Sequence, residues 1–282
     1  MKLVRFGAPG AERPGVVDAQ GAIRDLSAQI PDITGDTLSD GVLDKLRKVD
    51  LKAMPMAAKG VRLGAPVGNV RNFIAVGLNY SDHAKETGMA IPTEPILFNK
   101  LPNCIVGPND DVMVPKGSLK LDYEVEIAFV VGKRARYVAE KDALSHIAGY
   151  CICNDVSERH FQLERSGQWL KGKCAETFGP LGPWLVTRDE IADVGNLAMA
   201  LDVNGQRRQT GNTSTMIFSI PFQLAYISQF MVLEPGDVVT TGTPPGVALG
   251  MKPPGWLKAG DAMTLTIEGL GEQQTKVVPF KE

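Results

Sequence analysis

The stretch from Leu121 to Val131 restricts the fold more than any other part of the chain, because apolar and acidic residues alternate along it. Every odd position in the stretch is apolar, and the even positions begin with Asp122, Glu124 and Glu126. A period of two predicts a β-strand with one buried face. On such a strand Glu124 and Glu126 point to the same side, roughly 7 Å apart.

Two interpretations of this acidic pair stay open. Like charges at this separation repel each other, and a divalent cation would remove the repulsion because Mg²⁺ and Ca²⁺ prefer carboxylate oxygens. The alternative is an acidic face exposed to water, since Asp and Glu are common on protein surfaces. The strand by itself favours the exposed face, whereas residues further along the chain favour the cation site.

Composition narrows the class of protein. The 282 residues, 44% of them hydrophobic, suffice for one large domain or for a large and a small one. A net charge of −2, without a basic stripe that carries interleaved aromatic residues, argues against a nucleic-acid partner. The N-terminal residues lack the apolar run of a signal peptide, and no apolar run reaches membrane-spanning length. We therefore expect a soluble, cytoplasmic protein without a membrane partner.

The four cysteines are Cys104, Cys151, Cys153 and Cys174, and no two of them have the C-x-x-C spacing. Two of them lie in an apolar run, where a thiol packs as a small hydrophobic group. This pattern predicts free thiols in a reducing compartment and argues against a zinc site.

Hydrophobic periodicity and turn residues divide the chain into a small and a large part. Residues 1–68 predict a small N-terminal accessory domain, which ends in a linker with Gly and Pro at 59–69. Residues 69–282 predict a larger, strand-rich domain, and the thirty glycines and nineteen prolines suit its many turns. Strands are expected at 3–6, 15–18, 22–26, 72–77, 95–100, 104–107, 121–131, 149–153, 197–203, 206–209, 238–241 and 263–267. Helices are expected at 41–49, 81–88, 140–146, 155–163 and 219–230, and a loop at 177–183.

His83 is the best candidate for a general base among the three histidines, which also include His146 and His160. His83 and Glu86 are three residues apart on a predicted helix, so their side chains share a face and can touch. A carboxylate that holds one imidazole nitrogen fixes the tautomer and makes the other nitrogen a better base. An ordinary pair on the helix surface is the alternative, and the spacing alone favours it.

Further polar residues could complete a cation site around the acidic pair. Asp155 follows a buried strand, where an Asp either caps the next helix or supplies a third carboxylate ligand. Lys100 and Lys173 either lie on the surface or reach into such a site. The loop from Gly242 to Val247 either cradles a carboxylate with successive backbone N–H groups or forms a plain turn.

Six short motifs occur in a fixed order between residues 76 and 247. They are 76–80 with His83 and Glu86, 122–126, 154–159, Lys173 with 178–180, 233–237, and 241–247. Each motif alone is a weak pattern, whereas all six in this order are specific. In these motifs the chain resembles the fumarylacetoacetate hydrolase family over roughly residues 70–280, behind a small N-terminal domain. The resemblance implies a strand-rich α+β fold, a mixed β-sandwich roll, that forms a homodimer or a higher homo-oligomer.

The resemblance also implies which residues bind a metal and activate water. Glu124, Glu126 and Asp155 match the metal ligands of the family, for Mg²⁺ with Mn²⁺ or Ca²⁺ as alternatives. His83 and Glu86 match a dyad that activates water, on a segment that covers the site.

The remaining site residues follow from the same comparison. Lys173 matches a lysine near the metal and is expected to be catalytic. Arg159 and the loop around Thr243 lie where the family holds the carboxylate of its substrate. Substrate contacts are therefore expected at Arg159, Gly242, Thr243, Tyr80 and Lys100.

The implied reaction is hydrolysis of the C3–C4 bond of a 2,4-dioxo acid, an acylpyruvate, to pyruvate and a carboxylic acid. The segments 171–173, 177–190 and 250–254 are similar to a subgroup that cleaves 2,4-dioxo-3-deoxy sugar acids. An example is 2,4-diketo-3-deoxy-L-rhamnonate, from rhamnose catabolism, which yields pyruvate and lactate; the fuconate equivalent is similar. Alternatives are an oxaloacetate-type decarboxylase, a hydroxy-dienedioate isomerase, a ureidoglycolate lyase, and a metal-binding scaffold without activity.

Overall fold

β-strands make up the larger part of the regular secondary structure, as the period-two alternation and the turn residues predict. The computed structural model describes residues 1–88 and 90–282, without the side chains of His83 and Thr87. The strands are β1 (Lys2–Phe6), β2 (Arg13–Val17), β3 (Ile23–Asp25), β4 (Leu63–Gly64), β5 (Phe73–Gly77), β6 (Ile96–Lys100), β7 (Ile105–Val106), β8 (Val112–Met113), β9 (Leu121–Asp122), β10 (Val125–Val131), β11 (Ile147–Asn154), β12 (Ser157–Glu158), β13 (Gly179–Thr187), β14 (Ala198–Val203), β15 (Gln206–Asn212), β16 (Val238–Thr240), β17 (Ala262–Ile267) and β18 (Gly271–Val278). The α-helices are α1 (Asp40–Leu46), α2 (Ser81–Thr87), α3 (Arg159–Leu163), α4 (Leu170–Lys173) and α5 (Ile220–Phe230).

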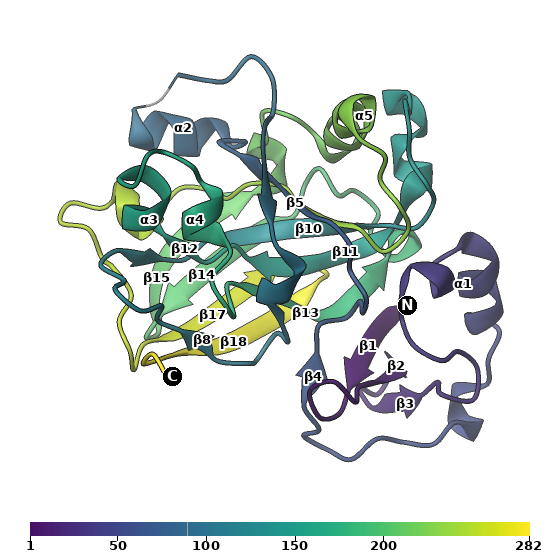
Figure 1. Ribbon diagram of the computed structural model, residues 1–282. Coiled ribbons are helices and arrows are strands. Elements are labelled where there is room, and N and C mark those ends of the chain that lie inside the picture. Colours follow the sequence, from purple (N-terminus) through teal and green to yellow (C-terminus); the bar gives the residue numbers. More distant parts are fainter. Residues whose placement is uncertain (89) are drawn as a thin grey trace.

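Two mixed sheets carry the fold (Figure 1), which confirms the strand-rich α+β class. The larger sheet has the strand order β3-β2-β1-β13-β11-β10-β16-β5-β6, and the smaller has the order β15-β14-β17-β18-β8. Two buried glutamines join the two sheets. Gln209 on β15 accepts a hydrogen bond from the backbone N–H of Val125, and Gln273 on β18 donates to the carbonyl oxygen of Ile152. Such contacts fix one sheet relative to the other.

The acidic stretch differs from the single strand that its alternation predicts. It forms β9 and β10 with a break at Tyr123 and Glu124. The prediction of a strand with only one buried face is wrong, because Glu124 is 5% and Glu126 2% exposed. The cause lies in the tertiary structure: β10 is a central strand, paired with β11 and β16, and side chains from later segments cover its acidic face.

Strand register brings distant residues to one end of the larger sheet. Val125 lies opposite Asn154 in the antiparallel pair β10–β11, so Asp155 follows directly beside Glu124. The backbone N–H of Asp155 donates to the carbonyl oxygen of Glu124 at 3.0 Å. The parallel pair β16–β5 ends at the same edge, and the loop that starts at Thr241 is therefore adjacent.

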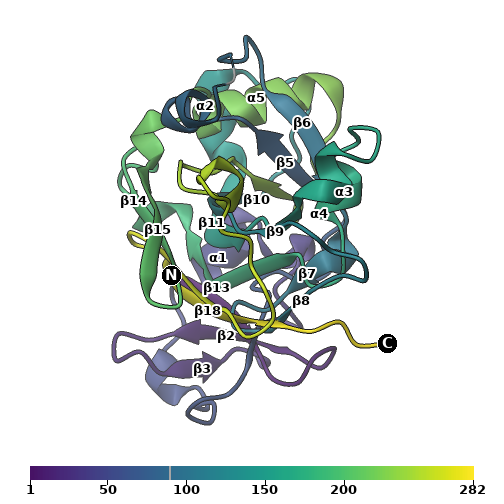
Figure 2. The same cartoon turned by 90° about the vertical axis from the view of Figure 1, so that its left-hand side faces the viewer.

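The N-terminal region extends the larger sheet through β1, which pairs antiparallel with β13. Its three strands lie at the end of the molecule opposite α2 in both views (Figures 1 and 2). The expected linker at 59–69 contains β4, which pairs with β1. The division of the chain at residues 68 and 69 stays a prediction.

Two local predictions between β11 and β14 are wrong. The helix expected at 155–163 begins only at Arg159, because Glu158 caps it by accepting the N–H of Phe161 at 2.6 Å. The loop expected at 177–183 is the start of β13, where Gly and Pro residues suggested turns. Tertiary context decides here, since β13 lies between β1 and β11.

Other local predictions are confirmed. Asn204 and Gly205 have φ of 52° and 74°, as a type I′ turn between β14 and β15 requires. Ser219 caps α5 by accepting the N–H of Phe222. All four cysteines are free thiols. Among the described residues, no helix combines the length and the apolar character needed to cross a membrane.

Candidate active site

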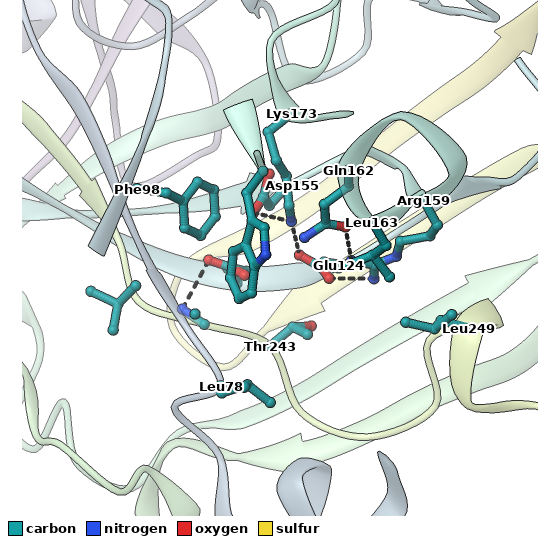
Figure 3. Close-up of a pocket in the computed structure, with 15 residues that line it drawn as sticks. Leu78, Phe98, Glu124, Asp155, Arg159, Gln162, Leu163, Lys173, Thr243 and Leu249 are labelled. Carbon is teal, nitrogen blue, oxygen red and sulfur yellow. Dashed lines mark hydrogen bonds and ion pairs between the residues drawn. The ribbon is translucent and has the colours of Figure 1, made fainter. Parts of the chain in front are cut away.

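Three buried carboxylates meet where β10 begins and β11 ends. Glu124 and Glu126 come from the start of β10 and Asp155 follows β11; one oxygen from each lies within 4.8 Å of the others. Figure 3 shows Glu124 and Asp155 facing the same cavity. The structure thus brings together the three residues that the sequence assigns as metal ligands.

Three cations contact this group directly, namely Lys173, Arg159 and Lys100. The ammonium of Lys173 lies 2.7 Å from Oε2 of Glu124 and 2.7 Å from Oδ2 of Asp155. The guanidinium of Arg159 reaches Glu124 from another side, with Nη2 at 2.5 Å from Oε1 (Figure 3). Its Nε donates to Asp122 at 2.8 Å.

Glu126 has a different environment. Its Oε2 accepts hydrogen bonds from the hydroxyl of Thr240 and from the backbone N–H of Gly242. Among the described side chains, no cation forms an ion pair with it. Gly242 has a φ of 96°, and a Cβ there would lie 2.8 Å from Cβ of Asn79, so glycine is required for this close approach.

The two glutamates therefore differ in acidity. Burial by itself would raise the pKa of Glu124, but the charges of Arg159 and Lys173 outweigh burial and hold the pKa at about 2. Burial raises the pKa of Glu126 well above its usual value, and repulsion from Asp155 and Glu124 raises it further. The surroundings therefore favour the charged form of Glu124, whereas Glu126 has no ion-pair partner among the described side chains and its charged form is disfavoured.

The donor set fits a divalent cation. Four buried carboxylates, from Asp122, Glu124, Glu126 and Asp155, face three buried cations, from Lys100, Arg159 and Lys173. One negative charge is in excess, and oxygen ligands of this kind suit hard divalent ions such as Mg²⁺ or Mn²⁺. The site therefore carries an acidic triad that can bind a metal ion.

A cavity of about 60 Å³ opens onto the triad. Its lining includes Arg159, Lys173, Gly242 and Thr243, so these four predicted residues lie at the site.

Tyr80 and Lys100 are not part of the cavity lining, although the sequence assigns them to substrate contacts. The hydroxyl of Tyr80 donates to Sδ of Met199, and its side chain is fully buried. Lys100 is also fully buried; its ammonium donates to Oδ1 of Asp155 at 2.6 Å and to the carbonyl oxygen of Lys173 at 2.6 Å. Lys100 points inward from the end of β6, and its hydrogen bond holds Asp155 in place.

The predicted dyad lies on α2. The side chain of His83 is outside the described residues, so the pairing of His83 with Glu86 stays a prediction. The carboxylate of Glu86 accepts the backbone N–H of Gly246 at 3.1 Å, which ties α2 to the loop after β16. That loop does cradle carboxylates, but those of Glu126 and Glu86 from the protein itself.

Several residues at the site have no role in the sequence analysis. Gln162 accepts a hydrogen bond from Nη1 of Arg159 at 2.9 Å and so orients the guanidinium. Leu78, Phe98 and Trp169 line the cavity. Gln162 lies three residues after Arg159 on α3, a spacing that could have revealed it. The other three come from separate segments and carry no local signal.

Comparison with known proteins identifies the family. Residues 72–278 match the family described as fumarylacetoacetate (FAA) hydrolase, C-terminal. A Burkholderia multivorans protein, provisionally named a hydrolase, is 56% identical over 97% of both chains. A fumarylacetoacetate hydrolase from Exiguobacterium antarcticum is 39% identical with a TM-score of 0.88, covering 99% of this chain and 100% of its own.

Two other solved structures align with this chain over 100% of its length and 100% of their own. A maleylpyruvate hydrolase from Sphingobium sp. SYK-6, in complex with manganese(II) and pyruvate, is 29% identical with a TM-score of 0.83. A 2-hydroxyhepta-2,4-diene-1,7-dioate isomerase from Mycobacterium marinum is 30% identical with a TM-score of 0.75. The named relatives are hydrolases and an isomerase, which supports an enzyme. The chain belongs to the fumarylacetoacetate hydrolase family.

Proposed function

We propose that the chain is a metal-dependent hydrolase that cleaves the C3–C4 bond of an acylpyruvate into pyruvate and a carboxylic acid. The observation that carries this proposal is the buried triad of Glu124, Glu126 and Asp155, with one negative charge in excess and a cavity beside it. The manganese and pyruvate in the Sphingobium hydrolase support it, because that relative shares the fold over its whole length.

The triad would hold the metal ion, and we propose Mg²⁺, with Mn²⁺ or Ca²⁺ as alternatives. Such an ion supplies Lewis acidity to the oxygens of a bound 2-oxo acid. Arg159 and Thr243 would fix the carboxylate of the substrate, since both line the cavity beside the triad. A fixed carboxylate holds the reacting carbon in one orientation, which lowers the entropic part of the barrier.

His83 would take a proton from water, and Glu86 would orient its ring. The oxygen of that water adds to C4, the C3–C4 bond breaks, and its electron pair moves to the pyruvate half as an enolate. Lys173 would stabilise this negative charge, since its buried ammonium stands at the cavity wall. A proton then returns to C3, and pyruvate and a carboxylic acid leave.

Among acylpyruvates we propose 2,4-diketo-3-deoxy-L-rhamnonate or a similar sugar acid. The acyl half of that compound is a three-carbon lactoyl group, and the segments 171–173, 177–190 and 250–254 carry the resemblance. The second candidate is isomerisation of a hydroxy-dienedioate, which the Mycobacterium marinum neighbour favours. Isomerisation releases no carboxylic acid, so product analysis separates the two.

The test is pyruvate release from acylpyruvates, 2,4-dioxo-3-deoxy sugar acids, a hydroxy-dienedioate and oxaloacetate, each with Mg²⁺ and with EDTA. The proposal predicts equimolar pyruvate and carboxylic acid, and no product in EDTA. Pyruvate with CO₂ from oxaloacetate alone would make the protein a decarboxylase. A change in the ultraviolet absorbance of the hydroxy-dienedioate, without release of pyruvate, would make it an isomerase.

The role of His83 has its own test. His83→Ala should lower turnover by about 10²–10⁴-fold, the range for loss of a general base, and leave metal binding intact. Unchanged turnover would exclude His83 as the base. We also propose that the protein is cytoplasmic and forms a homodimer or a higher homo-oligomer; sedimentation equilibrium would measure the oligomeric state.

A further inference from the structure

One side of the cavity is apolar and includes Leu78, Phe98 and Trp169. The ring of Phe98 lies 5.2 Å from the ammonium of Lys173, which itself contacts Glu124 and Asp155. Trp169 packs edge-on against Phe98, with ring centroids 5.3 Å apart. The aromatic pair therefore begins one side chain away from the triad (Figure 3 labels Phe98 and Lys173).

The indole ring of Trp169 packs directly against the backbone of Gly77. A Cβ at Gly77 would lie 2.4 Å from Cζ3 and 2.9 Å from Cη2 of the indole ring, distances that real side chains do not show. Only glycine leaves room for the ring in this position. Gly77 is the last residue of β5, so the rigid sheet fixes the place of Trp169.

Leu78 completes the apolar side of the cavity, and its backbone conformation is unusual. Its φ is 51°, in the left-handed region that a leucine rarely adopts. The following residue holds this conformation, because the amide of Asn79 bonds the backbone of Phe218 and of Thr241. Strain of this kind collects at functional sites, and here the strained residue lines the cavity.

We propose that Leu78, Phe98 and Trp169, the acyl wall, contact the acyl group of the substrate and that Trp169 limits its size. This inference rests on the proposed function. On this proposal short acyl groups of two or three carbons are accepted, and longer alkyl or aryl groups collide with the indole, because Gly77 at the end of β5 fixes the position of the ring.

The experiment compares Trp169→Leu with the wild type on acetylpyruvate, butanoylpyruvate, hexanoylpyruvate and benzoylpyruvate in Mg²⁺. In the wild type, kcat/KM should fall steeply from acetylpyruvate to the two largest substrates. Trp169→Leu should raise the ratio of benzoylpyruvate to acetylpyruvate at least about tenfold, since removed bulk in an apolar pocket is worth that much or more. Trp169→Phe should give an intermediate ratio and serves if the leucine variant does not fold.

The matched control is Leu170→Ala, because Leu170 is the next residue, is 43% exposed and does not line the cavity. It should leave the ratio unchanged. If wild type and Trp169→Leu show the same ratio while both release pyruvate, the size limit is overturned and the proposed function stands.

A binding measurement decides the matter if no acylpyruvate is hydrolysed, an outcome that removes the proposed function. Pyruvate and 2-oxo-4-phenylbutanoate are compared by their effect on the melting temperature in Mg²⁺. The wild type should respond to pyruvate only, and Trp169→Leu to both ligands. Equal responses in the two proteins would overturn the inference.

A double substitution tests whether Gly77 positions the indole ring of Trp169. Gly77→Ala puts a methyl group into the ring of Trp169 and should lower the melting temperature and kcat/KM. In the Trp169→Leu background the same change should have little effect, because the collision partner is gone. Additive effects would show that the contact with Gly77 does not position Trp169.

Discussion

Two clusters of charged side chains in this molecule have similar composition and opposite character. The junction cluster joins the N-terminal strands to the rest of the chain and consists of Arg5, Arg62, Glu12, Asp32 and Asp110. Each of its three carboxylates contacts a guanidinium, at distances from 2.5 to 3.6 Å. Its side chains are 9–29% exposed, so water screens the remaining charge.

The site cluster consists of Asp122, Glu124, Glu126, Asp155, Lys100, Arg159 and Lys173. Its paired side chains are at most 7% exposed, and Glu126 lacks a cationic partner among the described side chains. Both clusters have one carboxylate more than they have cations. The difference teaches that burial together with an unpaired carboxylate marks a binding site, whereas charge count alone does not.

The largest expected effect is that of Asp155→Ala. Asp155 accepts hydrogen bonds from Lys100 and Lys173, and its removal leaves the buried ammonium of Lys100 without a carboxylate partner and Lys173 with Glu124 alone. The free energy of unfolding should fall by about 3–5 kcal/mol, measured by urea unfolding in EDTA. Asp110→Ala in the junction cluster is the control and should cost below about 1 kcal/mol, since its partner Arg62 is partly exposed and keeps Glu12. Equal losses of unfolding free energy in the two variants would contradict the difference between the two clusters.

A smaller effect of opposite sign is expected at Glu126. Glu126→Gln removes the unpaired buried charge and keeps an acceptor for Thr240 and Gly242, so the free energy of unfolding in EDTA should rise by about 1 kcal/mol or more. Glu12→Gln, which breaks an ion pair with Arg62, should lower it. Chemical denaturation at pH 7 measures both. A loss of stability in Glu126→Gln would show that the charge of Glu126 is balanced in the folded protein.

The smallest expected effect is a pH dependence in the junction cluster. Burial by itself would raise the pKa of Glu12, but hydrogen bonds and charges, chiefly from Arg62, lower it below its usual value of 4.5. A lowered pKa stabilises the fold above the pKa of the unfolded chain, and this stability is lost as the pH falls through the folded-state pKa. The difference between wild type and Glu12→Gln should therefore be below about 1 kcal/mol at pH 7 and shrink in acid. A constant difference from pH 7 to pH 3 would contradict this.

The sequence predicted the site better than it predicted the surroundings of the site. Alternation and motif order pointed to Glu124, Glu126 and Asp155, because their spacing is a local property of β10 and of the end of β11. The same alternation suggested one exposed face, since no local pattern shows that later segments cover it. The roles of Lys100 and Trp169 depend on register and packing between distant segments, which a single sequence does not display.

Turn residues give a wrong prediction where the backbone is packed between other strands. Gly179, Pro180, Gly182 and Pro183 indicate a loop by their intrinsic preference, yet they form the start of a central strand. At Asn204 and Gly205 the same kind of signal was right, because a hairpin turn at the surface is determined by its own two residues. Local signals are therefore reliable at exposed turns and unreliable between packed strands.

The central claim is that the buried triad holds a divalent ion, and the most direct test is the number of Mn²⁺ ions bound per chain. Equilibrium dialysis followed by metal analysis, on the wild type and on Glu126→Gln, measures this number. We predict one tightly bound Mn²⁺ per wild-type chain and strongly weakened binding in Glu126→Gln, which still folds. A wild type that binds no Mn²⁺, or a variant that binds it equally well, would contradict the account.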